Sequence, residues 1–168
     1  MTVQPKMKTM SDSLGLIEPQ EHGTAQYLTF LLGDEVYGVD ILRVQEIKGW
    51  KKVTHLPNTP DYLCGVLNVC GTIIPVVDLR LRFGMPAHAF TPETMMVVLK
   101  VNDTRERMVA IVVDDVADAH NVMLEEVKPV PDFGRLINTD FISGLVLIDD
   151  SMVILLNIDR LLRVEALG

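Results

Sequence analysis

The sequence predicts a mostly β protein that consists of two small, fused β-barrels. Short apolar runs are separated by turn signals at intervals of roughly 8–12 residues, a spacing typical of small barrels. The segment 65–80 recurs in the second half as 144–159, in the same order of apolar run, two-residue turn, apolar run and helix cap. Each half therefore supplies about five short strands, and the repeat indicates two copies of one unit.

The opening hairpin of each half is indicated by two strand-like runs around a turn. Residues 27–32 and 36–39 flank the turn signal at 33–35. Residues 95–101 and 108–113 flank a polar stretch in the second half. Runs rich in β-branched and aromatic residues that are separated by turn residues are typical of antiparallel hairpins.

Three apolar residues after the first hairpin, Ile41, Val44 and Ile47, recur at helical spacing. This spacing predicts an amphipathic segment that buries one face in the core. The alternative is that part of the stripe lines a groove for a partner's helix, with Glu46 at the rim.

A second hairpin closes each half. The two-residue turns at 70–71 and 149–150 set the strand register, so that Val69 pairs with Thr72 in the first half. Because the register is set at the turn, the apolar residues on either side line up across the ladder.

Short capped helices follow the closing hairpins. Asp78 and Asn157 accept hydrogen bonds readily from the free N–H groups of a starting helix, so we expect helices over 79–83 and 158–162. The preceding runs, 73–77 and 152–156, lack polar alternation. This predicts strands that are covered on both faces where the barrels pack together.

Residues 1–24 lack periodicity and are expected to form a flexible tail, with 25–168 forming a single domain of two intertwined barrel subdomains.

Composition excludes several classes of protein. No apolar run approaches the ~20 residues that span a bilayer, and no signal-peptide core is present. We therefore expect a cytoplasmic protein without direct membrane insertion. With 15 Lys and Arg against 23 Asp and Glu, the net charge of -8 disfavours nucleic acid.

Residues that often carry chemistry form no catalytic or metal-binding pattern. Cys64 and Cys70 would lie roughly 20 Å apart on an extended strand, too far for a disulfide, so both should be free thiols. Their spacing and the scattered histidines match no metal-ligand pattern, and we expect neither a metal nor another cofactor. The adjacent carboxylates Asp114 and Asp115 leave a small enzyme or ligand-binding barrel as an alternative to a binding module.

A set of ordered motifs covers residues 27–164 at compatible spacings. The motifs are Tyr27-Leu-Thr-Phe, the stretch 36–47, Leu56-Pro57, Gly65-Val-Leu-Asn, the stretch 74–80 and the stretch 111–116. Together they resemble the CheW family of bacterial chemotaxis coupling proteins. The resemblance implies two Src-homology-3-like five-stranded barrels around a shared hydrophobic core, with short helices.

The same resemblance implies a non-enzymatic adaptor. Such an adaptor couples the cytoplasmic tips of methyl-accepting chemoreceptors to the regulatory domain of the histidine kinase CheA. Carried over by position, the receptor-facing residues, in a groove between the barrels, are Ile41, Val44, Glu46, Ile47 and Gly65. The kinase-facing residues are expected at the tip of the first closing hairpin and are Asn68, Cys70 and Gly71.

Cys70 departs from the family pattern, which usually has Asn-x-Arg-Gly at this turn. A cysteine cannot make the bidentate contacts or salt bridges of an arginine. Two interpretations stay open. The change is either drift at a tolerant turn or the mark of a diverged scaffold that serves a different receptor and kinase pathway.

Overall fold

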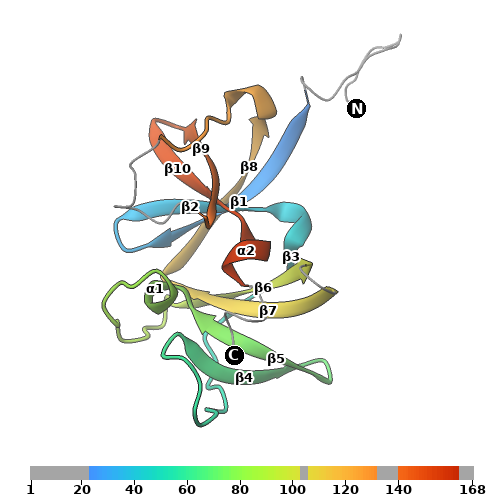
Figure 1. The fold of residues 1–168 in the computed structure, drawn as a ribbon, viewed down its shortest axis with the longest axis vertical. Helices are drawn as coiled ribbons and strands as arrows, with labels where there is room; N and C mark the ends of the chain where they lie inside the picture. Colours follow the sequence, from blue (N-terminus) through green and yellow to red (C-terminus); the bar gives the residue numbers. More distant parts are fainter. Residues whose placement is uncertain (1–22, 103–105, 132–139, 163–168) are drawn as a thin grey trace.

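The computed structural model describes residues 23–102, 106–131 and 140–162, and it contains two five-stranded sheets (Figure 1). The strands are β1 (Thr24–Leu32), β2 (Glu35–Asp40), β3 (Val44–Gly49), β4 (Leu63–Val69), β5 (Thr72–Asp78), β6 (Met95–Asn102), β7 (Glu106–Val113), β8 (Asp115–Met123), β9 (Ile142–Ile148) and β10 (Ser151–Leu156). The short helices are the 3₁₀ turns η2 (Ile41–Arg43) and η3 (Leu124–Glu126), and the α-helices α1 (Leu79–Arg82) and α2 (Ile158–Leu161). The predicted mostly β fold class is confirmed.

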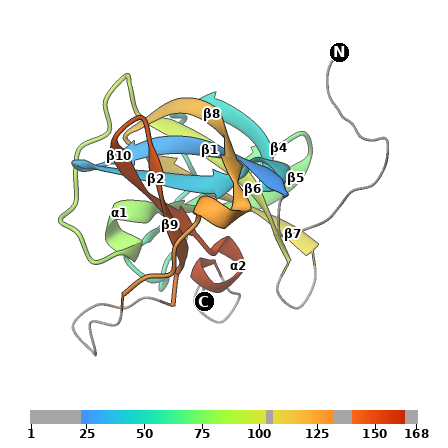
Figure 2. The same cartoon turned by 90° about the horizontal axis from the view of Figure 1, so that it is seen from above.

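The strand order shows that the two halves of the chain exchange strands. Sheet 1 has the order β8-β1-β2-β10-β9, and sheet 2 has the order β3-β6-β7-β5-β4. Each sheet therefore contains strands from both halves, and the two orders are the same when β1 is matched with β6, β2 with β7, and so on. Figure 2 shows the strands of sheet 1 crossing over those of sheet 2. Neither half can complete a sheet without the other.

The predicted tail, 1–24, lies outside the described residues except for its last two. Thr24 already belongs to β1 and pairs with Met123 of β8. The first strand of the domain is therefore held at its start by β8, a strand from the other half of the chain.

The closing hairpins have the predicted two-residue turns. Cys70 and Gly71 have φ values of 50° and 86°, and Asp149 and Asp150 have φ values of 50° and 66°. Positive φ at both central positions is the signature of the type I′ turn, whose twist matches that of the strands. The strands pair from Val69 opposite Thr72 and from Ile148 opposite Ser151, which confirms the predicted register.

The predicted helix caps are also confirmed. The side chain of Asp78 accepts hydrogen bonds from the backbone N–H groups of Arg80 and Leu81 at the start of α1. Asn157 accepts one from the N–H of Arg160 at the start of α2. Each helix is only one turn long, so these caps satisfy a large share of its free donors.

The central core lies between the sheets, and a smaller core lies on the far side of each one. Alternate residues of β6 and β7 face the two sides: Val97, Leu99, Val109 and Ile111 belong to the central core, whereas Met96, Val98, Ala110 and Val112 belong to the core of sheet 2. Both faces are therefore buried in β6 and β7, whereas the sequence predicted this burial for 73–77 and 152–156.

The same prediction is wrong at the first residues of β5 and β10. Ile73 is 62% exposed and Met152 is 52% exposed. The reason is that each strand pairs with its parallel neighbour only over its second part, since β5 pairs with β7 only from Val76 and β10 pairs with β2 only from Val153. The hairpin ends therefore project beyond the sheets.

Candidate partner-binding surfaces

The segment around Ile41 is mostly strand, so the helical interpretation of its spacing is wrong beyond the first turn. Only residues Ile41–Arg43 form a 3₁₀ turn, which begins where the side chain of Asp40 accepts a hydrogen bond from the N–H of Leu42 at 2.9 Å. From Val44 onward the chain forms β3 and pairs with β6.

A β-bulge nevertheless keeps Val44 and Ile47 on the same face. Val44 pairs with Leu99 and Ile47 with Val97, and the register shifts between Val44 and Glu46. In a regular strand, residues three apart point to opposite faces, but the extra residue of the bulge brings Val44 and Ile47 back to one face. Ile41 and Val44 pack against the central core, whereas Ile47 is 40% exposed. Of these three, Ile47 presents the most apolar surface to a partner.

Leu42 is the residue that the sequence interpretation missed. It is 78% exposed, more than any other large apolar side chain in the described part of the chain. The sequence did contain a sign of this exposure. Leu42 is apolar but does not share the spacing of Ile41, Val44 and Ile47, so the face that these residues bury would leave it outside the core. Isolated exposed apolar residues are common, but one this exposed, in the turn that leads into β3 and exposed Ile47, favours a contact surface.

Glu46 lies on the opposite face of β3 from Ile47, since its strand partner is Val98. Its carboxylate is 3.5 Å from the ammonium group of Lys48, and its side chain is 42% exposed. The Lys48 side chain is 17% exposed, and a partly exposed pair at this distance contributes little to stability. Because β3 is the edge strand of sheet 2, Glu46 is still available as a charge at the rim, on the other side of the strand from Ile47.

Gly65 is buried in β4 with a φ of 150°. A Cβ atom at this position would lie 2.7 Å from the carbonyl carbon of Thr54 and closer still to its oxygen. Thr54 and Val66 exchange two backbone hydrogen bonds, of 3.0 and 2.8 Å, which attach the loop after β3 to β4. Any influence of Gly65 on receptor binding must pass through that loop.

The expected kinase-facing residues lie together at the β4–β5 tip. The side-chain oxygen of Asn68 accepts a hydrogen bond from the N–H of Gly71 at 2.9 Å, and Asn68, Cys70 and Gly71 are all exposed. Ile73, opposite Asn68 in the ladder, adds an apolar side chain that the sequence placed in the core. The tip therefore combines a rigid turn, a thiol and an apolar residue.

Two ion pairs hold the sheets in a fixed relation. In the first, Arg43 of η2 donates to both carboxylate oxygens of Asp159 in α2, at 2.8 and 2.7 Å. Arg43 also donates to the carbonyl of Lys100, and Asp159 accepts from the N–H of Asn102 at 2.9 Å. Arg43 and Asp159 each come shortly after a strand of sheet 1, whereas the carbonyl of Lys100 and the N–H of Asn102 belong to β6 of sheet 2.

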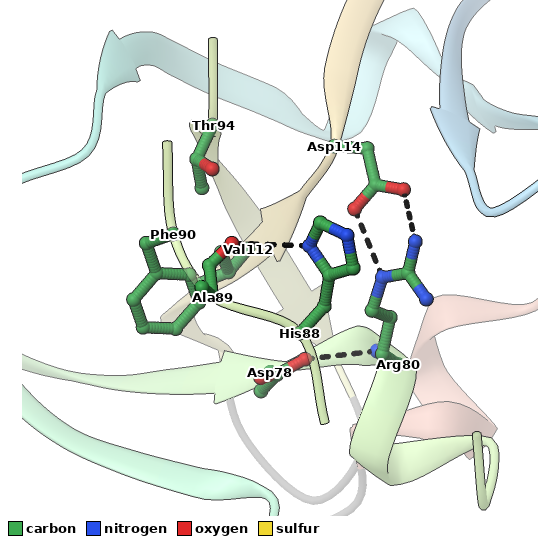
Figure 3. A pocket seen from close by; sticks show the side chains of 8 residues that line it. All are labelled: Asp78, Arg80, His88, Ala89, Phe90, Thr94, Val112 and Asp114. Carbon is green, nitrogen blue, oxygen red and sulfur yellow. Dashed lines mark hydrogen bonds and ion pairs between the residues drawn. The ribbon is translucent and has the colours of Figure 1, made fainter. Parts of the chain in front are cut away.

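The second ion pair is the equivalent one on sheet 2. Here the arginine is in the short α-helix, whereas in the first pair the aspartate is. Arg80 of α1 donates to both oxygens of Asp114 at 3.0 and 2.6 Å (Figure 3). Asp114 also accepts from the N–H of Gly33 at 2.8 Å. Here the charged residues follow strands of sheet 2 and the backbone group lies in the β1–β2 turn. Burial alone would raise the pKa of Asp114, but the hydrogen bonds from Arg80 and Gly33 outweigh it and lower the pKa.

These contacts argue against catalysis at the acidic residues. Asp114 is engaged by Arg80, and the carboxylate of Asp115 accepts from the N–H of Val116. The cavity between Arg80, Asp114, His88 and Thr94 measures only about 10 Å³ (Figure 3), enough for one water at most. Within the described ranges, no three His, Cys, Asp or Glu side chains are grouped to hold a metal ion. Nor does any helix there have the length and apolar content to cross a bilayer.

Comparison with known proteins identifies the fold. Residues 26–166 match the family described as the CheW-like domain. The chain is 39% identical over 143 residues to the chemotaxis protein CheW of Klebsiella aerogenes, which covers 85% of this chain and 84% of that protein. It is 32% identical over 144 residues to the chemotaxis protein CheW of Rhizobium meliloti, which covers 86% and 91%.

A solved structure agrees with the sequence matches. The fold is similar to the crystal structure of scaffolding protein TtCheW from Thermoanaerobacter tengcongensis, with a TM-score of 0.77 and 28% identity over 86% of this chain and 96% of that one. The two sheets thus correspond to the two Src-homology-3-like subdomains of that fold. The chain belongs to the CheW family, the non-enzymatic scaffolds of chemotaxis that couple receptors to the kinase CheA.

Proposed function

We propose that this chain acts in the cytoplasm and joins the cytoplasmic tip of a chemoreceptor to the regulatory domain of CheA through two separate surfaces. The observation that carries the proposal is the presence of two exposed apolar sites at opposite edges of sheet 2, Leu42 with Ile47 beside β3 and Ile73 on the β4–β5 hairpin. Nucleic acid and membrane lipid are not partners in this proposal.

The receptor contact is assigned to the η2–β3 surface, which comprises Leu42, Glu46 and Ile47. A receptor tip is helical, and a helix binds such a surface by laying its apolar side chains on exposed ones. Glu46 at the rim selects the orientation of the helix through its charge, because rim charges alter specificity more than affinity.

The kinase contact is assigned to the β4–β5 tip, which comprises Asn68, Cys70 and Ile73. The type I′ turn and the hydrogen bond from Gly71 to Asn68 hold the tip in one conformation. Binding to a rigid tip costs little ordering entropy, so a small contact surface suffices.

Coupling requires that the two surfaces keep their relative position. The ion pairs Arg43–Asp159 and Arg80–Asp114 each connect side chains of one sheet to the backbone of the other. A receptor and a kinase bound to this rigid body are held close together, which raises the effective concentration of each for the other.

Binding measurements with purified partners test the assignment. Leu42→Ser should weaken binding to a soluble receptor cytoplasmic fragment by about tenfold, because it removes an exposed apolar contact, while binding to the CheA regulatory domain stays unchanged. Ile73→Ser should have the opposite pattern. Both side chains are largely exposed, so the melting temperatures should stay close to that of the wild type.

Leu147→Ser is the matched control, since Leu147 is 60% exposed at the β9–β10 hairpin, the counterpart of the β4–β5 hairpin. It should leave both affinities unchanged. Loss of kinase binding in this variant instead of Ile73→Ser would move the kinase contact to the other hairpin. If neither partner binds the wild-type protein, the proposal fails as a whole.

A further inference from the structure

A cavity of about 280 Å³ lies at one end of sheet 1 and belongs to neither surface described above. It is bounded by the first residues of β9, the last residues of β2 and β10, and α2. Its polar lining consists of Tyr27, Asp40, Arg43, Ser143, Asn157 and Asp159. The open end of a small barrel is a common location for binding sites.

The charges in the cavity leave one carboxylate without a bonded counter-ion in the described part of the chain. Arg43 and Asp159 are paired with each other, as described above. Asp40 uses Oδ1 to accept from the N–H of Leu42, and among the described residues its Oδ2 accepts no hydrogen bond. The charge of Arg43 also acts on Asp40, but the two carboxylates of the lining outnumber this one cation. The cavity therefore favours a positively charged group that donates hydrogen bonds.

Tyr27 shows that the charge of Asp40 is felt inside the cavity. The two residues are directly opposite each other in the β1–β2 ladder, so their side chains share one face. The pKa of Tyr27 is raised, first by burial and then by the negative charge of Asp40. The phenol therefore stays neutral, and its oxygen can accept a second hydrogen bond from a cation that Asp40 binds.

Leu42 is not part of the lining, but it stands between the lining residues Asp40 and Arg43 in the chain. Leu42 is 78% exposed, and its backbone N–H donates a hydrogen bond to the carboxylate of Asp40, two residues earlier. A ligand with its cation in the cavity would place the adjacent group on this apolar side chain. A free amine has no such group, whereas a polypeptide does.

The geometry points to a site for one lysine or arginine side chain of a partner protein, with Asp40 as the counter-ion and Leu42 as the contact for a neighbouring apolar residue. The volume of the cavity lies just below the range of about 300–1,000 Å³ for small-molecule sites, which suits a single side chain. This site goes beyond the adaptor function; it shares Leu42 with the η2–β3 surface, whereas Asp40 and the cavity belong to this site alone.

The first test uses ethylguanidinium as the probe and follows backbone amide signals by nuclear magnetic resonance. Wild-type protein should show saturable shifts around Tyr27, Ser143 and Asn157, with a roughly millimolar dissociation constant. Asp40→Asn should weaken this binding by about tenfold or more, because it removes the charge. Asparagine keeps an oxygen for the N–H of Leu42, so the η2 turn should persist.

Asp61→Asn is the charge-matched control, because Asp61 is exposed in the loop between β3 and β4. It should bind the probe as the wild type does. The proposal is overturned if the shifts are not saturable at the cavity, or if Asp40→Asn binds as tightly as the wild type. A well-dispersed spectrum of Asp40→Asn verifies that the variant is folded.

The second test asks whether the cation belongs to a protein. The capped peptide Leu-Arg-Leu should bind about fivefold more tightly than ethylguanidinium, because a leucine covers part of Leu42. The peptide Ser-Arg-Ser, and Leu-Arg-Leu on the Leu42→Ser variant, should both lose this gain. Equal affinity for the peptides and the free cation would mean that the cavity takes a small amine, which contradicts the assignment to a partner protein.

Discussion

Gly65→Ala should destabilise the fold strongly, although the position offers no side chain to a partner. The φ of 150° suits glycine almost alone, which costs an alanine about 2 kcal/mol. The added Cβ would also overlap the carbonyl group of Thr54, so the loop must move. Movement breaks the two hydrogen bonds between Thr54 and Val66, which contribute about 1 kcal/mol each. The expected loss in the free energy of unfolding is about 4 kcal/mol.

Variants at two other glycines separate the cost of backbone strain from the cost of steric overlap. Gly71 has a φ of 86°, but a Cβ added there would have no atom within 4 Å, so Gly71→Ala should cost only about 1–2 kcal/mol. Gly144 has no such φ, and its Cβ would meet the side chain of Val127 at 2.6 Å and the carbonyl oxygen of Lys128 at 3.1 Å. Because the closest overlap is with a side chain, which can shift more easily than a backbone, and the backbone contact is less close than at Gly65, Gly144→Ala should also cost about 1–2 kcal/mol.

Equilibrium urea denaturation measures all three variants. The fluorescence of Trp50, the single tryptophan, and circular dichroism should report the same transition for each variant. The explanation is refuted if Gly65→Ala is no less stable than Gly71→Ala. If Gly65→Ala is destabilised as expected but its folded fraction binds receptor normally, Gly65 acts through the fold alone.

Three further outcomes are expected. In the native protein near pH 7, maleimide should label exposed Cys70 readily but not half-buried Cys64, because burial raises the pKa of Cys64 to about 12. Mass spectrometry should find one label per chain, and two labels or none would contradict this. Glu46→Arg should weaken receptor binding with little change in melting temperature, since the side chain is 42% exposed; unfolding would show that the charge is needed for the fold. Asp114→Asn should lower the free energy of unfolding by about 1.5–3 kcal/mol near pH 7 because it weakens the bond to Arg80. The pKa of Asp114 is lowered in the fold, so this contribution is present above the unfolded-state pKa of about 4 and is lost as the pH falls through the folded value. Denaturation curves should therefore converge at acidic pH, and a constant difference would oppose the assignment.

Local features of the fold were predictable from the sequence because neighbouring residues determine them. The turn at Cys70 depends on two backbone conformations, and the register of the strands follows from the turn. The cap at Asp78 depends on a side chain that reaches N–H groups two and three residues away. The family was predictable for a related reason, since the order and spacing of such local motifs distinguish one family from another.

The tertiary structure decided which strands share a sheet and therefore which apolar residues are exposed. Exchange of strands between the halves sets where the pairing of β5 with β7 begins, and this leaves Ile73 exposed within an apolar run. The ion pair of Arg43 with Asp159 joins residues 116 positions apart, which no local pattern indicates. The cavity at Asp40 likewise exists only where β2, β9 and α2 meet. Contacts between distant segments depend on how whole sheets pack, and that packing is a property of all ten strands together.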